Sequence, residues 1–292
     1  MFLDFPKKFH FRRTVYSHGW YSLLPFKLDE ENWRLSYVFS GGVLQTPVSA
    51  AISESGGKIE IETSEKSLTS VQKAKILADT RRIFRLDDDL SAFYKLTERE
   101  KEFAWISKAV GGRLLRSPTV YEDLVKTICT TNCSWAMTRK MVTNLVEKLG
   151  EVSGSGERAF PAPEKMAEMS PDFYREEIRA GYRAAYFTEL AEWVAAGNLD
   201  PEAWLDPDLP TKELKRQMKQ VKGVGDYAAE NLLKLVGRYD GLALDSWVRA
   251  QFYKKHNAGE VCEDREIRKF YERFDDWSGL VIWCDVTEKW FK

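Results

Sequence analysis

Asp245 is the side chain in this sequence whose setting best suits chemistry. It directly follows the apolar run at 242–244 and stands at the start of a predicted helix. An aspartate in that position is most often a helix cap, because its carboxylate accepts hydrogen bonds from free backbone N–H groups. In a partly dry cleft the same carboxylate stabilises a developing positive charge or accepts a proton from an attacking water. The residues that precede Asp245 favour the second interpretation.

Two predicted helices joined by a tight glycine turn precede Asp245. Gly223 and Gly225 mark the turn, where a positive φ or a close backbone approach favours glycine. Asp226 is predicted to cap the second helix. A helix that starts directly after two glycines presents unpaired backbone N–H groups with no side chains in front of them, which suits a phosphate. We therefore predict that the backbone of Gly223, Val224 and Gly225 binds a phosphate.

The hairpin, the helix after it and the aspartate together resemble the helix-hairpin-helix, Gly/Pro-rich-loop-Asp superfamily of base-excision DNA glycosylases. The stretch reads KQVKGVGDYAAENLLKLVG, then RYDG, then LALDSWVRAQFYKKH. Two other stretches agree: 111–132 resembles a helix of the 8-oxoguanine DNA glycosylases, and GYRAAYF at 181–187 resembles a further segment of that family. The resemblance covers roughly 111–286. It implies an enzyme that flips a damaged base out of double-stranded DNA and cleaves its N-glycosidic bond.

The resemblance makes Asp245 the catalytic residue and position 227 the residue that separates the branches of the superfamily. Bifunctional members carry a Schiff-base lysine two residues after the last hairpin glycine, where this chain has Tyr227. The implied enzyme is monofunctional, and water is its nucleophile. If the chain does form a covalent adduct, another amine has taken the role, for example that of Lys222 or Lys234. Whether Asp245 activates the water or stabilises the oxocarbenium-like state stays open.

Tyr227 also bears on the substrate. An aromatic residue at this point is similar to the bacterial 3-methyladenine DNA glycosylase II type, and it suits alkylated purines because their cationic rings stack on π-faces. Packing between helices is the other interpretation of Tyr227. The 111–132 stretch favours oxidised purines such as 8-oxoguanine instead. An alkylated purine is the first prediction and an oxidised purine the alternative.

The resemblance assigns more residues to DNA and to the base pocket. Asn132 matches the residue that fills the hole left by the extruded nucleotide, although it also suits a turn between two helices. Lys222 stands where the family has proline, and it is predicted to add a phosphate contact or to stay solvated. Trp247 and Arg249, just after the aspartate, are predicted to reach the DNA backbone or the pocket.

Two tryptophans near the C-terminus are further candidates for the base pocket. Trp277 and Trp283 lie where family members place base-stacking aromatics, and core packing is the alternative for each. A different class of function is a non-catalytic helix-hairpin-helix module that only grips DNA. Asp245 and Asn132 favour the enzyme, since a module of that kind needs neither residue.

The overall charge excludes a strongly basic DNA-binding protein. Lys and Arg number 44 and Asp and Glu 45, so the net charge is −1. Attraction to DNA must therefore come from a local patch and from helix N-termini. No signal peptide and no apolar run long enough for a membrane helix are visible. We expect an intracellular monomer, in a bacterial nucleoid or a nucleus, whose partner is double-stranded DNA with a damaged base and not a membrane.

The sequence predicts no metal centre. The cysteines at 129, 133, 262 and 284 do not have the spacing of a zinc or iron–sulfur site. Free thiols in a reducing compartment are the expected state. No cofactor is expected to be required, although hairpins of the resembled family can bind a monovalent cation.

The elements that must position these residues indicate an α+β fold. Residues 9 to about 62 are predicted to form an antiparallel sheet, because apolar residues alternate with polar ones at 33–39 and 58–62. Helices are expected at 67–83, at 87–95 and near 98–109, where Thr97 and Glu100 form a capping box. From Gly111 onward nearly every segment has helical character.

We predict two domains from this pattern. Residues 1–110 hold the sheet with its helices, and residues 111–292 form a mainly helical domain of two lobes. The lobes comprise roughly 135–221 and, in the other, 111–134 with 222–292. In the resembled family, DNA and the flipped base enter between such lobes. Helices are expected at 164–179, 182–196 and 200–205, and Ser134 is expected to cap the helix before Gly150.

Overall fold

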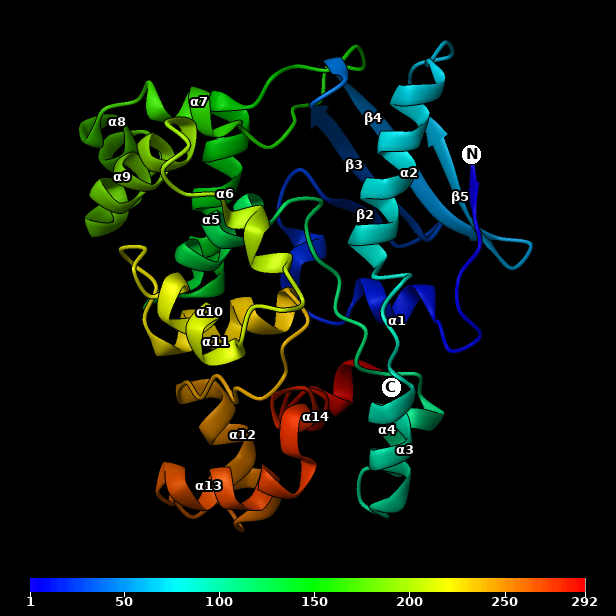
Figure 1. Cartoon of the computed structure of the whole chain (residues 1–292), viewed down its shortest axis with the longest axis vertical. Coiled ribbons are helices and arrows are strands. Elements are labelled where there is room, and N and C mark those ends of the chain that lie inside the picture. Colours follow the sequence, from blue (N-terminus) through cyan, green and yellow to red (C-terminus); the bar gives the residue numbers. More distant parts are fainter. Residues whose placement is uncertain (292) are drawn as a thin grey trace.

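The computed structural model describes residues 1–291 and shows a small sheet beside a large helical body (Figure 1). The five strands are antiparallel and follow the order β1-β5-β4-β3-β2. Their bounds are β1 Phe2–Leu3, β2 Lys27–Asp29, β3 Arg34–Gly41, β4 Leu44–Ser55 and β5 Lys58–Thr63. The predicted alternation is confirmed, since Leu35, Tyr37 and Phe39 of β3 and Ile59 and Ile61 of β5 are buried.

The start of the predicted sheet is helical instead. Helix α1 spans Phe11–Val15, and a 3₁₀ turn, η1, spans Gly19–Ser22. The His10 side chain caps α1 by accepting from the backbone N–H of Arg13, and Phe11 and Val15 are buried one turn apart. This local cap and i, i+4 pair override the strand interpretation from residue 9.

The helices of the first hundred residues are shifted from their predicted positions. They are α2 Ser70–Phe84, α3 Ser91–Arg99 and α4 Ala104–Lys108. The predicted capping box was wrong: Thr97 lies inside α3, where its hydroxyl donates to the carbonyl of Phe93. A capping box does form at the start of α2, between Thr69 and Gln72.

The remaining chain is helical, as predicted. The α-helices are α5 Val120–Thr130, α6 Trp135–Leu149, α7 Pro163–Ala167, α8 Pro171–Glu176, α9 Ala184–Ala195, α10 Thr211–Met218, α11 Asp226–Leu235, α12 Ser246–His256, α13 Asp264–Tyr271 and α14 Ser278–Val286. The 3₁₀ helices are η2 Gly181–Arg183, η3 Pro201–Leu205, η4 Glu272–Trp277 and η5 Glu288–Phe291. Ser134 caps α6, as expected. The helix predicted at 164–179 is two helices, because Ser170 caps a new one that begins at Pro171.

Helix α5 ties the sheet to the helical body. All of its residues from Val120 to Cys129 are buried. The Lys126 ammonium lies 2.6 Å from the Glu122 carboxylate, which also accepts a 2.6 Å hydrogen bond from Tyr37 of β3. Each member of this buried group therefore has a partner, as buried charge requires.

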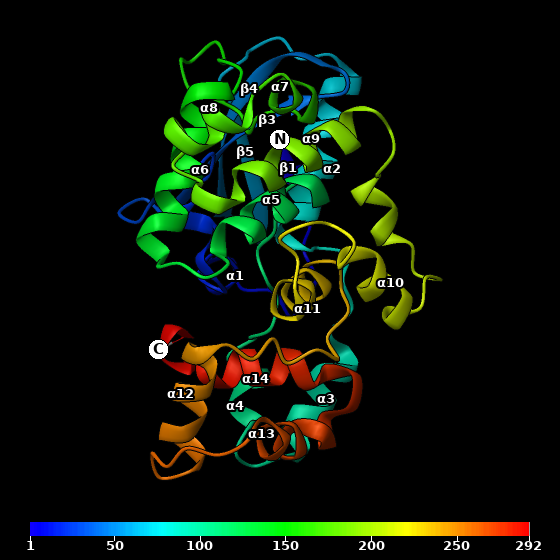
Figure 2. The same cartoon turned by 90° about the vertical axis from the view of Figure 1, so that its left-hand side faces the viewer.

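Two hydrophobic clusters divide the chain differently from the predicted boundary at 110. The first contains the sheet, α2, α5 to α11 and the segments between them. The second joins α3 and α4 to α12, α13 and α14, where Phe93 and Phe103 meet Tyr271 and Phe274. Figure 2 shows this second layer below α11. Helices α3 and α4 thus pack with the C-terminal helices, whereas α5 and α11, which contact each other, belong to the cluster that contains the sheet.

Two further expectations concern membranes and thiols. Within residues 1–291, no helix combines the length and the apolar character that a membrane span needs. All four cysteines are free thiols, and Cys129 and Cys284 are buried.

Candidate active site

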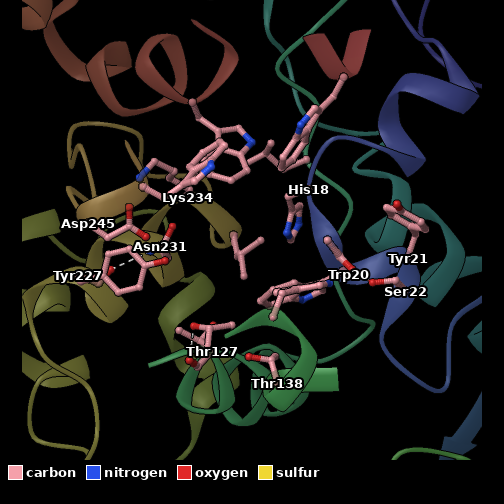
Figure 3. Close-up of a pocket in the computed structure, with 18 of the residues that line it drawn as sticks. His18, Trp20, Tyr21, Ser22, Thr127, Thr138, Tyr227, Asn231, Lys234 and Asp245 are labelled. Atoms are coloured by element: carbon pink, nitrogen blue, oxygen red, sulfur yellow. Dashed lines mark hydrogen bonds between the residues drawn. The ribbon is translucent and has the colours of Figure 1, made fainter. Parts of the chain in front are cut away.

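Four parts of the chain surround a cavity of about 720 Å³ (Figure 3). This volume is in the range of small-molecule sites. The lining residues come from the N-terminal segment, the α5–α6 region, α11 and the C-terminal helices: Tyr16, His18, Gly19, Trp20, Tyr21, Ser22, Leu114, Thr127, Thr130, Cys133, Trp135, Thr138, Tyr227, Asn231, Lys234, Leu235, Asp245, Trp247, Trp283 and Trp290. In Figure 3, the labelled residues of α11 and Asp245 face His18 and Trp20 across the cavity.

Asp245 combines both of its predicted interpretations. Its carboxylate caps α12 by accepting a 2.7 Å hydrogen bond from the backbone N–H of Val248. The residue is half-buried and lines the cavity. Glu230 of α11 holds the segment before it, because its carboxylate accepts a 2.6 Å hydrogen bond from Ala243 N–H. The cap therefore fixes the direction in which the carboxylate points.

Tyr227 lies in the first turn of α11 and forms the wall next to Asp245. Burial, and then the neighbouring Asp245 carboxylate, raises the pKa of the Tyr227 phenol. The phenol therefore stays protonated at neutral pH and offers a ring face and a donor, not a nucleophile. Asn231, one turn further, donates a 3.0 Å hydrogen bond to the Tyr227 carbonyl.

The structure separates the two lysines that sequence reasoning left as possible amines. Lys222 is exposed and pairs with Glu189. Lys234 is 3% exposed and lines the cavity. Burial lowers the pKa of the Lys234 amine to about 7, against the opposing effect of Glu230, Asp240 and Asp245. Only Lys234 is placed to meet a ligand in this cavity.

One of the two predicted C-terminal tryptophans reaches the cavity. Trp283 lines it and donates a 2.8 Å hydrogen bond to the Ser17 carbonyl. Trp277 does not line the cavity and instead has the alternative placement, packing in the core. Its ring stacks on Tyr239 at 5.2 Å and lies 5.4 Å from Phe93, within the second hydrophobic cluster.

Trp247 was predicted to reach either the DNA backbone or the pocket, and it lines the cavity. Its ring lies 6.2 Å from Trp283 and 5.9 Å from Trp290, so three indoles gather at this side. Trp290 was not predicted. Arg249, two residues beyond Trp247, does not line the cavity, because its guanidinium makes a bidentate pair with Asp264 at 2.7 and 2.8 Å.

The N-terminal segment supplies residues that sequence reasoning missed. His18 contacts the Leu115 carbonyl through Nε2, and burial lowers the pKa of its ring to about 4. Trp20 donates a 2.7 Å hydrogen bond to Asp123 of α5. The density of aromatic residues at 16–21 was the available signal, but the strand prediction hid it.

The hairpin glycines differ in what they do. Gly223 has φ +91°, and an added Cβ would lie 2.8 Å from the Tyr186 ring, so the fold itself requires glycine here. Gly225 has φ −85° and open space around its missing Cβ. It is also the N-cap of α11, which corrects the prediction for Asp226. Asp226 is the first helical residue and pairs with Lys219 at 3.0 Å and Lys215 at 3.2 Å.

Asn132 lies outside the cavity. It lies two residues beyond the end of α5, in the left-handed region at φ +47°, and its exposed amide donates to the Tyr182 hydroxyl at 3.3 Å. Val224 is buried, and its backbone N–H donates a 3.0 Å hydrogen bond to the Val221 carbonyl within the hairpin. Among residues 1–291, no group of three or more His, Cys, Asp or Glu side chains is arranged to hold a metal ion.

Several known proteins are similar to this chain in sequence or in structure. No family model matches the chain. The "Probable N-glycosylase/DNA lyase" of Methanothermobacter thermautotrophicus is 24% identical over 218 residues, which covers 65% of this chain and 67% of that protein. The 3-methyladenine DNA glycosylase of Archaeoglobus fulgidus has a TM-score of 0.79 at 16% identity and covers 100% of this chain and 99% of its own.

A second solved structure is similar along its whole length. The Clostridium acetobutylicum 8-oxoguanine glycosylase/lyase, in complex with double-stranded DNA, has a TM-score of 0.73 at 21% identity and covers 98% of this chain and 99% of its own. The chain therefore has the fold shared by 3-methyladenine and 8-oxoguanine DNA glycosylases. The predicted resemblance to the helix-hairpin-helix glycosylases is confirmed at the level of the fold.

Proposed function

We propose that this protein is a base-excision-repair DNA glycosylase. It accepts a damaged purine turned out of double-stranded DNA and hydrolyses the N-glycosidic bond. The observation that carries the proposal is the position of Asp245, a half-buried carboxylate on the wall of a largely aromatic cavity. A module that only grips DNA has no use for such a cavity.

Cleavage of an N-glycosidic bond builds positive charge on the sugar. The Asp245 carboxylate stabilises that charge or takes a proton from water, and its cap to Val248 keeps it oriented. Because position 227 carries tyrosine, water is the proposed nucleophile and the enzyme is monofunctional. The tyrosine and indole faces around the cavity suit an alkylated, cationic purine.

The proposed DNA grip uses the hairpin and the rim of the cavity. The N–H groups of Gly223 and Gly225 are the proposed donors to a phosphate at the start of α11, because the N–H of Val224 between them already donates to the Val221 carbonyl at 3.0 Å. Asn132, beside Tyr182, is placed to fill the gap left by the base. Lys222 reaches a phosphate only by leaving Glu189. The proposed reaction needs no cofactor. A monovalent cation at the hairpin stays a prediction. The protein is proposed to act as a monomer.

An oxidised purine is the second candidate substrate. Lys234 favours it, because an amine in the cavity wall is a hydrogen-bond donor for an oxo group and not a partner for a cationic ring.

Base release from duplexes that each contain one lesion tests the function, with Asp245→Asn as the key variant. Asparagine caps helices about as well as aspartate, so thermal unfolding should shift little. Base release should fall by roughly 10²–10⁴ while lesion binding is retained. Asp200→Asn is the matched control, because Asp200 caps η3 by accepting from Glu202 N–H and does not line the cavity. Release as fast as the parent's from Asp245→Asn would remove the catalytic assignment.

A further inference from the structure

Lys234 is a buried amine in the cavity wall that the reaction above does not use. It lies seven residues after Tyr227 in α11, so both side chains project from the same face of the helix two turns apart. Helical side chains lean toward the N-terminus of their helix, which directs the amine back toward Asp245. Figure 3 shows Lys234 beside Asp245 and across the cavity from His18 and Trp20.

The Lys234 amine has unused hydrogen-bonding capacity. Its recorded hydrogen bond among the described residues is a long one, 3.4 Å, to the Glu230 carbonyl in the preceding turn. An ammonium carries three donors and a neutral amine two. At 3% exposure the Lys234 side chain is largely removed from bulk solvent, and its free donors face the cavity. A ligand in the cavity is the partner that satisfies them.

We propose that Lys234 selects the class of base: its amine donates to an oxo or ring-nitrogen acceptor of a neutral oxidised purine, and when protonated it disfavours a purine that carries positive charge. This rests on the proposed function and deepens it, because it assigns to one residue the choice between the two candidate substrates.

The charges around Lys234 leave it without a dedicated counter-ion. The groups that face it are Glu230 on its own helix, Asp240 after that helix, Asp245 at the start of α12 and Lys215 of α10. The Glu230 carboxylate is already held by Lys215 at 2.8 Å and by Ala243 N–H at 2.6 Å.

The other two carboxylates do not hold the amine either. Asp245 accepts from Val248 N–H, and no close ion pair joins Asp240 or Asp245 to Lys234 among the described residues. His18, on the opposite wall, is neutral because its ring pKa is lowered to about 4. Burial lowers the pKa of the Lys234 amine to about 7, so both of its charge states are populated near neutral pH.

This arrangement predicts a pH-dependent preference. Below about pH 7 the ammonium repels a cationic base, and above it the neutral amine admits one while still donating to an oxo group. The ratio of cationic-base release to neutral-base release should therefore rise with pH. Because both lesions need the Asp245 carboxylate, an effect that acts through Asp245 cancels in this ratio.

Single-turnover base release from duplexes with one N7-methylguanine or one 8-oxoguanine, between pH 6 and 8.5, tests the proposal. For the parent, the methylated-to-oxidised ratio should rise about tenfold across this range. In Lys234→Met, which keeps the length and apolar stem of the side chain, the ratio should become independent of pH. Release of 8-oxoguanine should fall about 10- to 100-fold, the loss expected for a hydrogen bond to a charged donor, and release of N7-methylguanine should hold or rise. Lys148→Met, on α6, whose exposed ammonium pairs with Glu177 away from the cavity, should leave the ratio unchanged.

The outcomes separate failure of this proposal from failure of the proposed function. If the parent releases neither base, the function itself fails. If the parent releases only 8-oxoguanine, Lys234→Met must slow that release. If the parent releases only N7-methylguanine, Lys234→Met must leave that release equal or make it faster. An equal loss for both lesions, or an unchanged pH profile, overturns the role of Lys234 in selection. A borohydride-trapped adduct that disappears in Lys234→Met would make Lys234 a nucleophile, which overturns both this role and the water mechanism.

Discussion

At the scale of single residues, the site places one carboxylate and one amine close together without pairing them. Asp245 caps α12, and Lys234 projects from α11 with a single long hydrogen bond. A fold optimised for stability alone would neutralise or remove a buried ammonium of this kind. Functional sites often retain residues that lower the stability of the fold, and replacing such a residue raises the free energy of unfolding.

Lys234→Met should raise the free energy of unfolding at pH 6 by about 1–4 kcal/mol. The pKa of Lys234 falls from the ordinary 10.5 to about 7 on folding, so the folded state prefers the neutral amine. The cost of the lysine is therefore full below about pH 7 and disappears as pH rises toward 10.5. Urea unfolding at pH 6 and pH 10 checks this, and the gain should shrink at the higher pH. A loss of stability at both pH values would show that the amine is well paired in the folded state.

At the scale of elements, the hairpin between α10 and α11 separates a glycine needed for folding from one needed for contact. Gly223 adopts positive φ against Tyr186, whereas Gly225 has an ordinary φ and faces open space. The lysines near the turn are already paired with Glu189 and Asp226. The backbone N–H groups at the start of α11 therefore contribute more to the proposed grip than side-chain charge does.

Gly225→Val should weaken binding to damaged and undamaged duplex alike, because the side chain blocks the approach of a phosphate, while thermal unfolding changes little. The parent's slope of log K against log salt should be shallower than about −6, since each phosphate contact contributes about −0.9. Gly223→Ala is the contrasting variant and should lower the melting temperature. Titrations of both duplexes at several salt concentrations measure these effects. Weaker binding to damaged duplex alone would assign the hairpin to the base pocket.

At the scale of the whole molecule, the cavity depends on contacts between segments far apart in sequence. The Trp283 indole bonds the Ser17 carbonyl, and Trp20 bonds Asp123. Arg85, at the end of α2, donates to the carbonyls of Lys234 and Leu235 at 2.9 and 3.1 Å. The N-terminal region therefore supplies part of the cavity wall and also holds the end of the helix that carries the amine.

Arg85→Met should lower the free energy of unfolding by about 3 kcal/mol or more, because it removes a buried donor from Asp88, from the Tyr239 hydroxyl and from both carbonyls that end α11. The Lys234 and Leu235 carbonyls then keep only the Gly237 N–H and Arg116 as donors. The control is Arg81→Met, four residues earlier, whose partly exposed pair with Asp87 should contribute less than about 1 kcal/mol. Urea unfolding of both variants measures the difference. Equal effects would mean that Arg85 does not hold α11 in place.

Local patterns allowed the sequence by itself to determine the hairpin, Asp245 and the antiparallel sheet. The spacing from Gly225 to Asp245 is set by one helix and one short loop, and the alternation around Ile59 and Ile61 is a property of a single strand. Such patterns need no knowledge of distant partners. The start of α1 shows the limit, since the cap by His10 outweighs a strand-like composition.

The tertiary structure alone decided which side chains share the cavity. Trp277 and Trp283 are six residues apart, yet Trp277 packs on Tyr239 and Trp283 reaches Ser17. Lys234 resembles any helical lysine in the sequence, and only the packing of α11 in the folded chain, where it contacts α5, takes its amine out of water. Burial and long-range contacts depend on how separate segments pack together. A side chain therefore has a desolvation cost and a shifted pKa only in the folded protein.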